Sequence, residues 1–270
     1  MKKTALALTA LAVVVTAAYG TNYLGSVISS WDGRHVQGSA TYYPLGITYG
    51  DGHIWLCYST FFTKRLPATG SIVDLVGFSG RYGYDLGYET STSYLYFACG
   101  TYGVYVRNSS TGADVRNFGL PAGATSASGI DFDNGTAASP VWLGDQTAWR
   151  IFNLTSTGSL VSSLSTTFGG VGGVAYDGAT SGGPYLFAGT RGTPCQVYSV
   201  SPTSGSVLYS FEAPVSNGAL RGLTWDGTYL WTIDNRFGSP NVGWVYQFIG
   251  YVPNIGVVPA SVGKIKALYR

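Results

Sequence analysis

Residues 222–231 read Gly-Leu-Thr-Trp-Asp-Gly-Thr-Tyr-Leu-Trp, a pattern of glycine, hydrophobic residue and aromatic residue followed by a turn and a second apolar run. The same pattern begins at Gly46, Gly129 and Gly173, with a weaker copy at Gly83-Tyr84-Asp85-Leu86. The copies lie 37, 46, 44 and 49 residues apart. Short alternating apolar runs separated by Asp-Gly turns predict β-hairpins rather than helices.

A second motif, Gly-Ser/Ala-x-Val/Leu/Ile, recurs independently of the first. Its spacings are 45, 42, 46 and 47 residues, and it begins at Gly25, Gly70, Gly112, Gly158 and Gly205. Two motifs that share a period near 45 residues indicate one four-stranded propeller blade per repeat. We therefore predict an all-β, five-bladed β-propeller over residues 21–250.

The order of the motifs predicts how the ring closes. The copy at Gly25 has no strands before it, whereas the last blade, from Gly222 to Phe248, has three strands and no fourth. The N-terminal strand should therefore pair with Val245–Phe248, complete the last blade and remove an open sheet edge.

The first twenty residues predict an exported protein. Lys2 and Lys3 precede an apolar run from Ala5 to Val15, and small residues follow at the expected cleavage position, as in a secretory signal peptide. No other stretch has the length of a membrane span, and residues 251–270 form a C-terminal tail that we treat as a possible attachment signal. The expected location is extracellular, periplasmic or on the cell surface of a bacterium.

Charge excludes one class of partner. The chain has 15 Lys and Arg against 13 Asp and Glu, and removal of Lys2 and Lys3 with the signal peptide leaves these charges balanced. A neutral chain with 10% charged residues has no basic surface for nucleic acid. The three cysteines fit no zinc pattern, and a Cys57–Cys99 disulfide between neighbouring blades stays open.

The repeat at residues 222–231 resembles those of secreted bacterial propellers of the virginiamycin B lyase-like and plant-type glutaminyl cyclotransferase-like families. The resemblance covers about residues 21–250 and implies a propeller, five-bladed in the cyclotransferases. It would imply a catalytic Glu at the head of an inner strand, or a His and metal in the lyases. Here the glutamates beyond the signal peptide are Glu89 and Glu212, neither of which begins a first-strand motif, and the histidines are His35 and His53.

The loops that enter the inner strands, and those between second and third strands, should line the mouth of the central channel. Asp145 and Asp234 occupy equivalent places there, three residues after Trp142 and Trp231, and act either as ligand contacts or as turn residues. We predict no catalytic residues, metal or cofactor. The candidate ligand-binding residues are Tyr43, Arg81, Tyr82, Tyr102, Asp145, Arg191, Arg221, Asp234 and Arg236.

Aromatic faces together with Asp and Arg suit sugar rings and their hydroxyl groups. The sequence therefore favours a binding or surface propeller whose ligand is a carbohydrate or a protein. Two alternatives remain: a secreted enzyme of the lyase, cyclotransferase or glycosidase type, and a structural subunit of an extracellular assembly. The sequence does not fix the oligomeric state.

Overall fold

The computed structural model describes residues 24–135, 140–179, 183–215, 220–236 and 242–251. The side chains of Arg236 and Val242 also lie outside this description, as do the predicted signal peptide and nearly all of the tail. No helix long and apolar enough to cross a membrane occurs in the described part of the chain.

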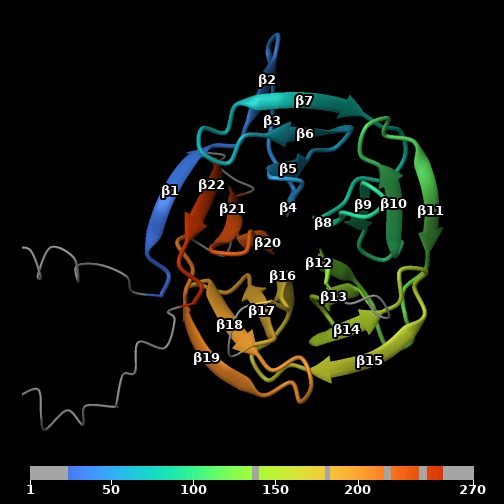
Figure 1. The fold of residues 1–270 in the computed structure, drawn as a ribbon, viewed down its shortest axis with the longest axis vertical. Helices are drawn as coiled ribbons and strands as arrows, with labels where there is room; N and C mark the ends of the chain where they lie inside the picture. Colours follow the sequence, from blue (N-terminus) through green and yellow to red (C-terminus); the bar gives the residue numbers. More distant parts are fainter. Residues whose placement is uncertain (1–23, 136–139, 180–182, 216–219, 237–241, 252–270) are drawn as a thin grey trace, which may run out of the picture.

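Five four-stranded antiparallel sheets surround a central channel, which confirms the predicted five-bladed propeller (Figure 1). Each blade runs from an inner strand to an outer strand. Blade 1 comprises β4 (Gly46–Gly50), β5 (His53–Cys57), β6 (Phe61–Arg65) and β7 (Ile72–Gly77), and blade 2 comprises β8 (Asp85–Glu89), β9 (Tyr94–Ala98), β10 (Val104–Asn108) and β11 (Asp114–Phe118). Blade 3 comprises β12 (Ala127–Phe132), β13 (Val141–Asp145), β14 (Arg150–Leu154) and β15 (Leu160–Ser165), and blade 4 comprises β16 (Val171–Asp177), β17 (Tyr185–Thr190), β18 (Gln196–Val200) and β19 (Val207–Glu212).

Blade 5 combines both ends of the propeller domain, as predicted. Its strands β20 (Leu220–Trp225), β21 (Leu230–Arg236) and β22 (Val242–Phe248) are followed in space by β1 (Val27–Asp32). Val27 pairs with Phe248 and Asp32 with Trp244, so β1 is the outer strand of the last blade. The N-terminal segment therefore closes the ring (Figure 1).

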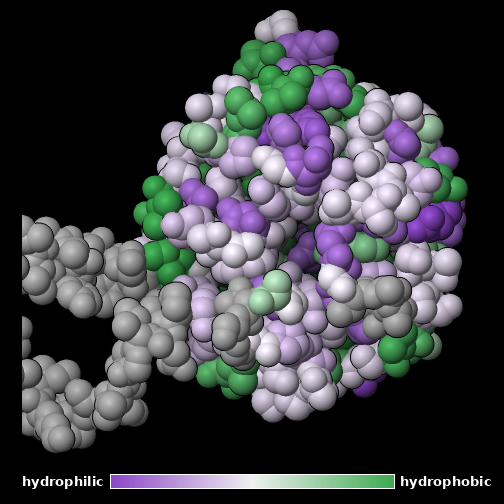
Figure 2. All heavy atoms as spheres, in the orientation of Figure 1, coloured by the Kyte–Doolittle hydropathy of each residue, from purple (hydrophilic) through white to green (hydrophobic). Residues whose placement is uncertain are grey.

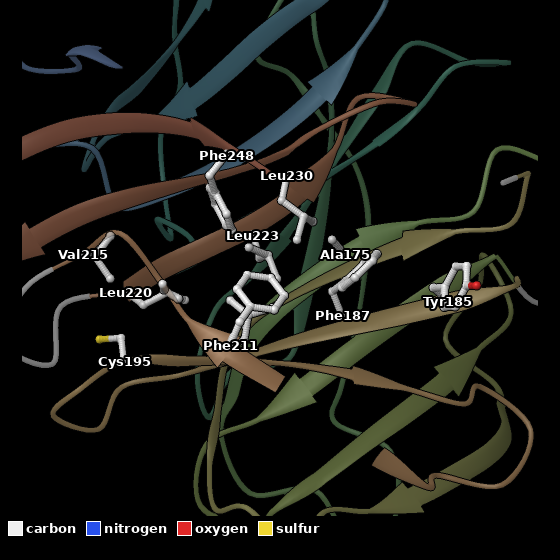
Figure 3. Close-up of a cluster of buried hydrophobic side chains, with 12 residues drawn as sticks. Ala175, Tyr185, Phe187, Cys195, Phe211, Val215, Leu220, Leu223, Leu230 and Phe248 are labelled. Atoms are coloured by element: carbon white, nitrogen blue, oxygen red, sulfur yellow. The ribbon is translucent and has the colours of Figure 1, made fainter. Parts of the chain in front are cut away.

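The core lies between neighbouring blades. Each of five buried hydrophobic clusters draws side chains from two adjacent sheets. Figure 3 shows the cluster between blades 4 and 5, where Phe187 and Phe211 meet Leu223, Leu230 and Phe248. At about 1.5–3 kcal/mol for each fully buried large side chain, these clusters are the main stabilising term.

The glycines of the second motif make the same contact in every blade. Each of the five has a positive φ, between 70° and 91°. Each also lies against the fifth residue of the preceding blade's outer strand, which leaves no room for a Cβ atom there or only enough for close contact. We call these five contacts the rim contacts; they are Gly25–Phe211, Gly70–Trp31, Gly112–Val76, Gly158–Phe118 and Gly205–Leu164.

The inner strands differ in one blade. Gly46, Gly129, Gly173 and Gly222 occupy one matching position, where a Cβ atom would meet the neighbouring inner strand. In blade 2 the strand register gives this position to Asp85, because Asp85 pairs with Ala98 as Gly46 pairs with Cys57. The predicted copy at Gly83-Tyr84-Asp85-Leu86 is therefore wrong by two residues: the copy begins at Asp85.

A short hairpin of β2 (His35–Gln37) and β3 (Ala40–Tyr42) connects β1 to blade 1 and projects from the ring (Figure 1). The sequence analysis did not predict it. Its base is fixed because the Tyr58 hydroxyl donates to the Gly33 carbonyl oxygen at 2.5 Å and the ring of His35 packs against Phe61.

Candidate functional site

The candidate site is the mouth of the channel, where loops from different blades come together. Arg191, directly after β17, donates from Nη1 to Oε1 of Gln146, directly after β13, at 2.7 Å. The loops between second and third strands of blades 3 and 4 therefore meet, as the sequence predicted. Figure 2 shows hydrophilic residues near the centre of the ring and hydrophobic residues at separate places along its edge.

Asp85 occupies the channel below this mouth and joins three blades. Its Oδ1 accepts the amide of Ile47 in blade 1 at 3.2 Å, and its Oδ2 accepts the amide of Ile130 in blade 3 at 3.1 Å. The carboxyl also lies against Gly222 of blade 5, and no Cβ atom would fit there. Burial raises the pKa of Asp85 well above its usual range, and the negative charge of Asp131 adds to this shift.

Arg191 carries the clearest unmet hydrogen-bonding capacity at the mouth. Its Nε and Nη2 are buried and have no acceptor among the described residues. Its pKa falls to about 10, first because of burial and then because the positive charge of Arg221 is close; Asp85 acts in the opposite direction. Arg191 therefore faces the channel with two N–H groups that nothing in the described chain satisfies.

Aromatic side chains accompany the arginines. The guanidinium carbon of Arg221 lies 5.7 Å from the centre of the Tyr84 ring, and burial lowers the pKa of Arg221. Tyr82 packs edge-on against Tyr84 with ring centres 6.0 Å apart. The surface thus combines cations with aromatic faces.

Arg81 and Tyr102 extend this surface outward. Arg81 stacks on the Tyr102 ring at 3.6 Å, and both residues are exposed. The structure therefore groups five predicted residues: Arg221 lies close to Arg191 and to Tyr82, and Arg81, next to Tyr82 in the sequence, stacks on Tyr102.

The carboxylate of Asp145 acts on its own loops. It is buried and accepts backbone N–H groups of Thr125 at 2.5 Å, Ser126 at 2.7 Å, Thr147 at 2.8 Å and Ala148 at 2.7 Å. Burial alone would raise the pKa of Asp145, but these four donors hold it below its usual value. Asp145 therefore has the turn role that the sequence analysis left open.

The other predicted residues lie in blade 5 and at the base of the hairpin. Asp234 is buried in β21 opposite Leu220 and Trp244, in the place that Asp145 occupies in blade 3. Tyr43 is half-buried at the base of the hairpin, near Arg34. The backbone of Arg236 ends β21, and its side chain lies outside the described residues.

Three residues of the mouth were not among the predicted site residues. Tyr84 and Asp85 lie in the weaker copy of the first motif, and the sequence gives no signal of their role because only strand pairing shows that Asp85 takes the glycine position. Trp149 is 55% exposed and has a positive φ of 54°, which is rare for an aromatic residue. Its loop is fixed by Asp145, whose carboxylate accepts the backbone N–H groups of Thr147 and Ala148.

Within the described residues, no three His, Cys, Asp or Glu side chains are grouped so as to hold a metal ion. Cys57, Cys99 and Cys195 are buried free thiols, so the disulfide left open in the sequence analysis is not formed. Burial raises the pKa of the Cys57 thiol well above its usual value, which makes it a poor nucleophile.

Comparison with known proteins supports the fold alone. No family model matches the chain, and no curated protein matches it in sequence. The structure of glutaminyl cyclase from Myxococcus xanthus is similar, with a TM-score of 0.57 and 12% identity over 82% of this chain and 94% of that one. Hydrazine synthase from Kuenenia stuttgartiensis has a TM-score of 0.48 and 17% identity over 74% of this chain and 58% of that one.

Proposed function

We propose that this chain is an exported binding propeller that holds its ligand, a carbohydrate or a protein, at the mouth of the channel. One observation carries the proposal: Arg191 is fixed at the mouth by Gln146 but keeps two buried N–H groups without an acceptor. A buried donor without a partner costs about 1–3 kcal/mol, so a ligand acceptor at this place would gain that energy. The exposed rings of Tyr82 and Tyr102 supply flat contact area nearby.

A glycan array probed with the protein secreted from a bacterial host tests the proposal. We expect binding to a subset of glycans, and Arg191→Met should abolish it without lowering the melting temperature by more than a few degrees. Arg34→Met is the matched control, because Arg34 is an exposed arginine at the base of the hairpin, where it pairs with Asp32 at 2.6 Å. Absence of binding, together with turnover of a glycan or peptide, would refute a purely binding role.

Asp85 supports a second candidate function, catalysis in the channel. A buried carboxyl with a raised pKa, next to a guanidinium, is a common arrangement for a general acid. The similar Myxococcus protein is a glutaminyl cyclase, so glutaminyl cyclase activity is the first activity to assay. Turnover that is lost in Asp85→Asn, while the melting temperature and the Arg191-dependent glycan binding persist, would support this candidate.

A further inference from the structure

We propose that the mouth binds the carboxylate of an acidic sugar, a uronic acid unit, and that Arg191 is the residue that contacts it. This inference rests on the proposed binding function and names its ligand class. It is carried by one edge of the guanidinium group, whose two buried N–H groups have no acceptor among the described residues, by the charge around it and by the aromatic rings on the same face of the ring.

The position of Arg191 is fixed by two contacts. Nη1 is bonded to Gln146 at 2.7 Å, and the side-chain stem crosses Gly172 of β16. A Cβ atom on Gly172 would lie 2.8 Å from Cγ and 3.0 Å from Nε of Arg191, so glycine is needed for the stem to pass. The guanidinium group is therefore held before a ligand arrives, which lowers the entropy cost of binding.

The two guanidinium nitrogens without an acceptor, Nε and Nη2, match the geometry of one chemical group. Nε and Nη2 lie on the same edge of the planar guanidinium group, where their N–H bonds run parallel. Both lack an acceptor among the described residues. Two parallel N–H donors match the two oxygens of a carboxylate, and this bidentate pair is among the strongest hydrogen-bonded arrangements in proteins.

The local charge also favours an anion. Arg191 and Arg221 are close enough for each positive charge to disfavour the other, and Arg191 has no ion pair in the described part of the chain. The buried carboxyl whose charge acts on Arg191, Asp85, already accepts the amides of Ile47 and Ile130, and its raised pKa favours the neutral form. A ligand carboxylate would supply the missing negative charge.

The surroundings favour a sugar over a bare anion. Tyr82 is 44% exposed and Tyr102 is 54% exposed, and the stack of Arg81 on Tyr102 presents a flat surface on the same side of the ring. Flat aromatic surfaces pack against the CH-rich faces of sugar rings, while a charged group fixes the orientation. A uronic acid offers both features in one unit.

The test compares two probes that differ only in charge, trigalacturonate and its fully methyl-esterified form, by titration calorimetry on the secreted protein. We expect trigalacturonate to bind about tenfold tighter than the ester, and this advantage should shrink as salt is raised. Arg191→Met should remove the advantage, so that acid and ester bind equally weakly, whereas Arg34→Met should change neither affinity. If Arg191→Met does not fold, Arg191→Lys keeps the charge, loses the paired N–H groups, and should retain only part of the advantage.

The other outcomes separate this inference from the proposed function. Equal affinity for acid and ester in the native protein, or an advantage that survives in Arg191→Met, overturns the inference and leaves the binding function standing. Preferential binding of an acetylated peptide with a free C-terminal carboxylate over trigalacturonate overturns the sugar assignment. Failure to bind the two probes or any glycan on the array overturns both.

Discussion

The rim and the inner ring of the propeller use glycine for different reasons. At the rim, all five blades keep the glycine, and each one packs against the fifth residue of the neighbouring outer strand. Around the channel, blades 1, 3, 4 and 5 keep a glycine at the matching position, whereas blade 2 has Asp85 there. The rim contacts repeat the same glycine packing in all five blades. The inner ring repeats a glycine in four blades and departs from it only in blade 2.

Asp85, the exception in blade 2, makes contacts that a glycine could not make. A side chain at the inner-ring position must enter the channel, and Asp85 does so because Gly222 opposite has no Cβ atom. The Asp85 carboxyl then bonds to two other blades and lies near Arg191, the central residue of the candidate site. The glycine pattern thus maintains the ring, and its single departure lies beside the candidate site at the mouth of the channel.

Removing one rim strand should have the largest effect. Deletion of residues 22–31 removes most of β1, so that β22 becomes an open edge, and it removes both rim contacts of blade 5. We expect the purified protein to aggregate and to lose cooperative unfolding, as measured by size-exclusion chromatography and circular dichroism. Deletion of residues 258–270, which lie outside the described residues, is the control and should leave the melting temperature unchanged. A folded, monomeric deletion of residues 22–31 would contradict the closure.

A single rim contact should have the next largest effect. Gly158→Ala places a Cβ atom against the Phe118 ring at a φ of 91°, and we expect a loss of about 3 kcal/mol in the free energy of unfolding in urea. Gly52→Ala is the matched control: its φ is 71°, but nothing lies within 4 Å of the new Cβ, so only backbone strain of about 1 kcal/mol remains. Equal losses in the two variants would show that the packing at the rim contributes nothing.

The fold could be predicted because its signals are local and repeated. A motif that recurs five times gives the blade count, and the unmatched first copy gives the closure. The register of blade 2 could not be obtained in the same way. A search for glycine selects Gly83, whereas the matching residue is Asp85, and only strand pairing with Ala98 reveals this.

The site was predicted in part, for a physical reason. Topology places loops at one end of the ring, so the sequence could name Arg191 and Arg221 as mouth residues. It could not show that Arg191 bonds to Gln146, or that four backbone amides occupy Asp145, because such contacts depend on loop conformations. Asp145→Asn should therefore lower the free energy of unfolding, in addition to any effect on ligand binding.

Buried carboxyls distinguish the inner ring from the rim and should make stability depend on pH. Burial raises the pKa of Asp131 to about 8, well above the usual value of 3.8 for an aspartate, and its Oδ2 accepts the amide of Tyr176 at 2.7 Å. A raised folded-state pKa means that the stabilisation is complete below pH 3.8 and is lost as the pH rises through about 8. We expect a loss on the order of 1 kcal/mol per pH unit between pH 5 and pH 8.

Urea unfolding across this range measures the pH effect. Asp131→Asn should flatten the slope, because the amide does not titrate, while Asp114→Asn at the exposed rim should leave it unchanged apart from the loss of the Arg107 pair. An Asp131→Asn protein with the native slope would assign the dependence to another group, such as Asp85.

The smallest expected effect is a difference in stability between two threonine variants, Thr224→Val and Thr48→Val, at matching positions of two inner strands. Thr224 and Thr48 each stand two residues after the inner-ring glycine, and both are buried. Oγ1 of Thr224 accepts the amide of Tyr49 in the next blade at 3.0 Å, whereas Oγ1 of Thr48 has no partner among the described residues. Thr224→Val leaves a backbone amide without its acceptor and should cost about 1 kcal/mol in urea unfolding.

Thr48→Val is the matched control and should change the stability by less than about 0.5 kcal/mol, or raise it slightly, because the hydroxyl it removes is buried without a bond. The blade that follows Thr48 is blade 2, where Gly87 replaces the threonine and Asp85 replaces the glycine. Equal costs in the two variants would show that the hydroxyl of Thr48 is bonded after all, and that blade 2 is joined to blade 1 as blade 1 is joined to blade 5 through Thr224. Unequal costs would place a weaker junction beside Asp85, at the one departure of the inner ring from its repeat.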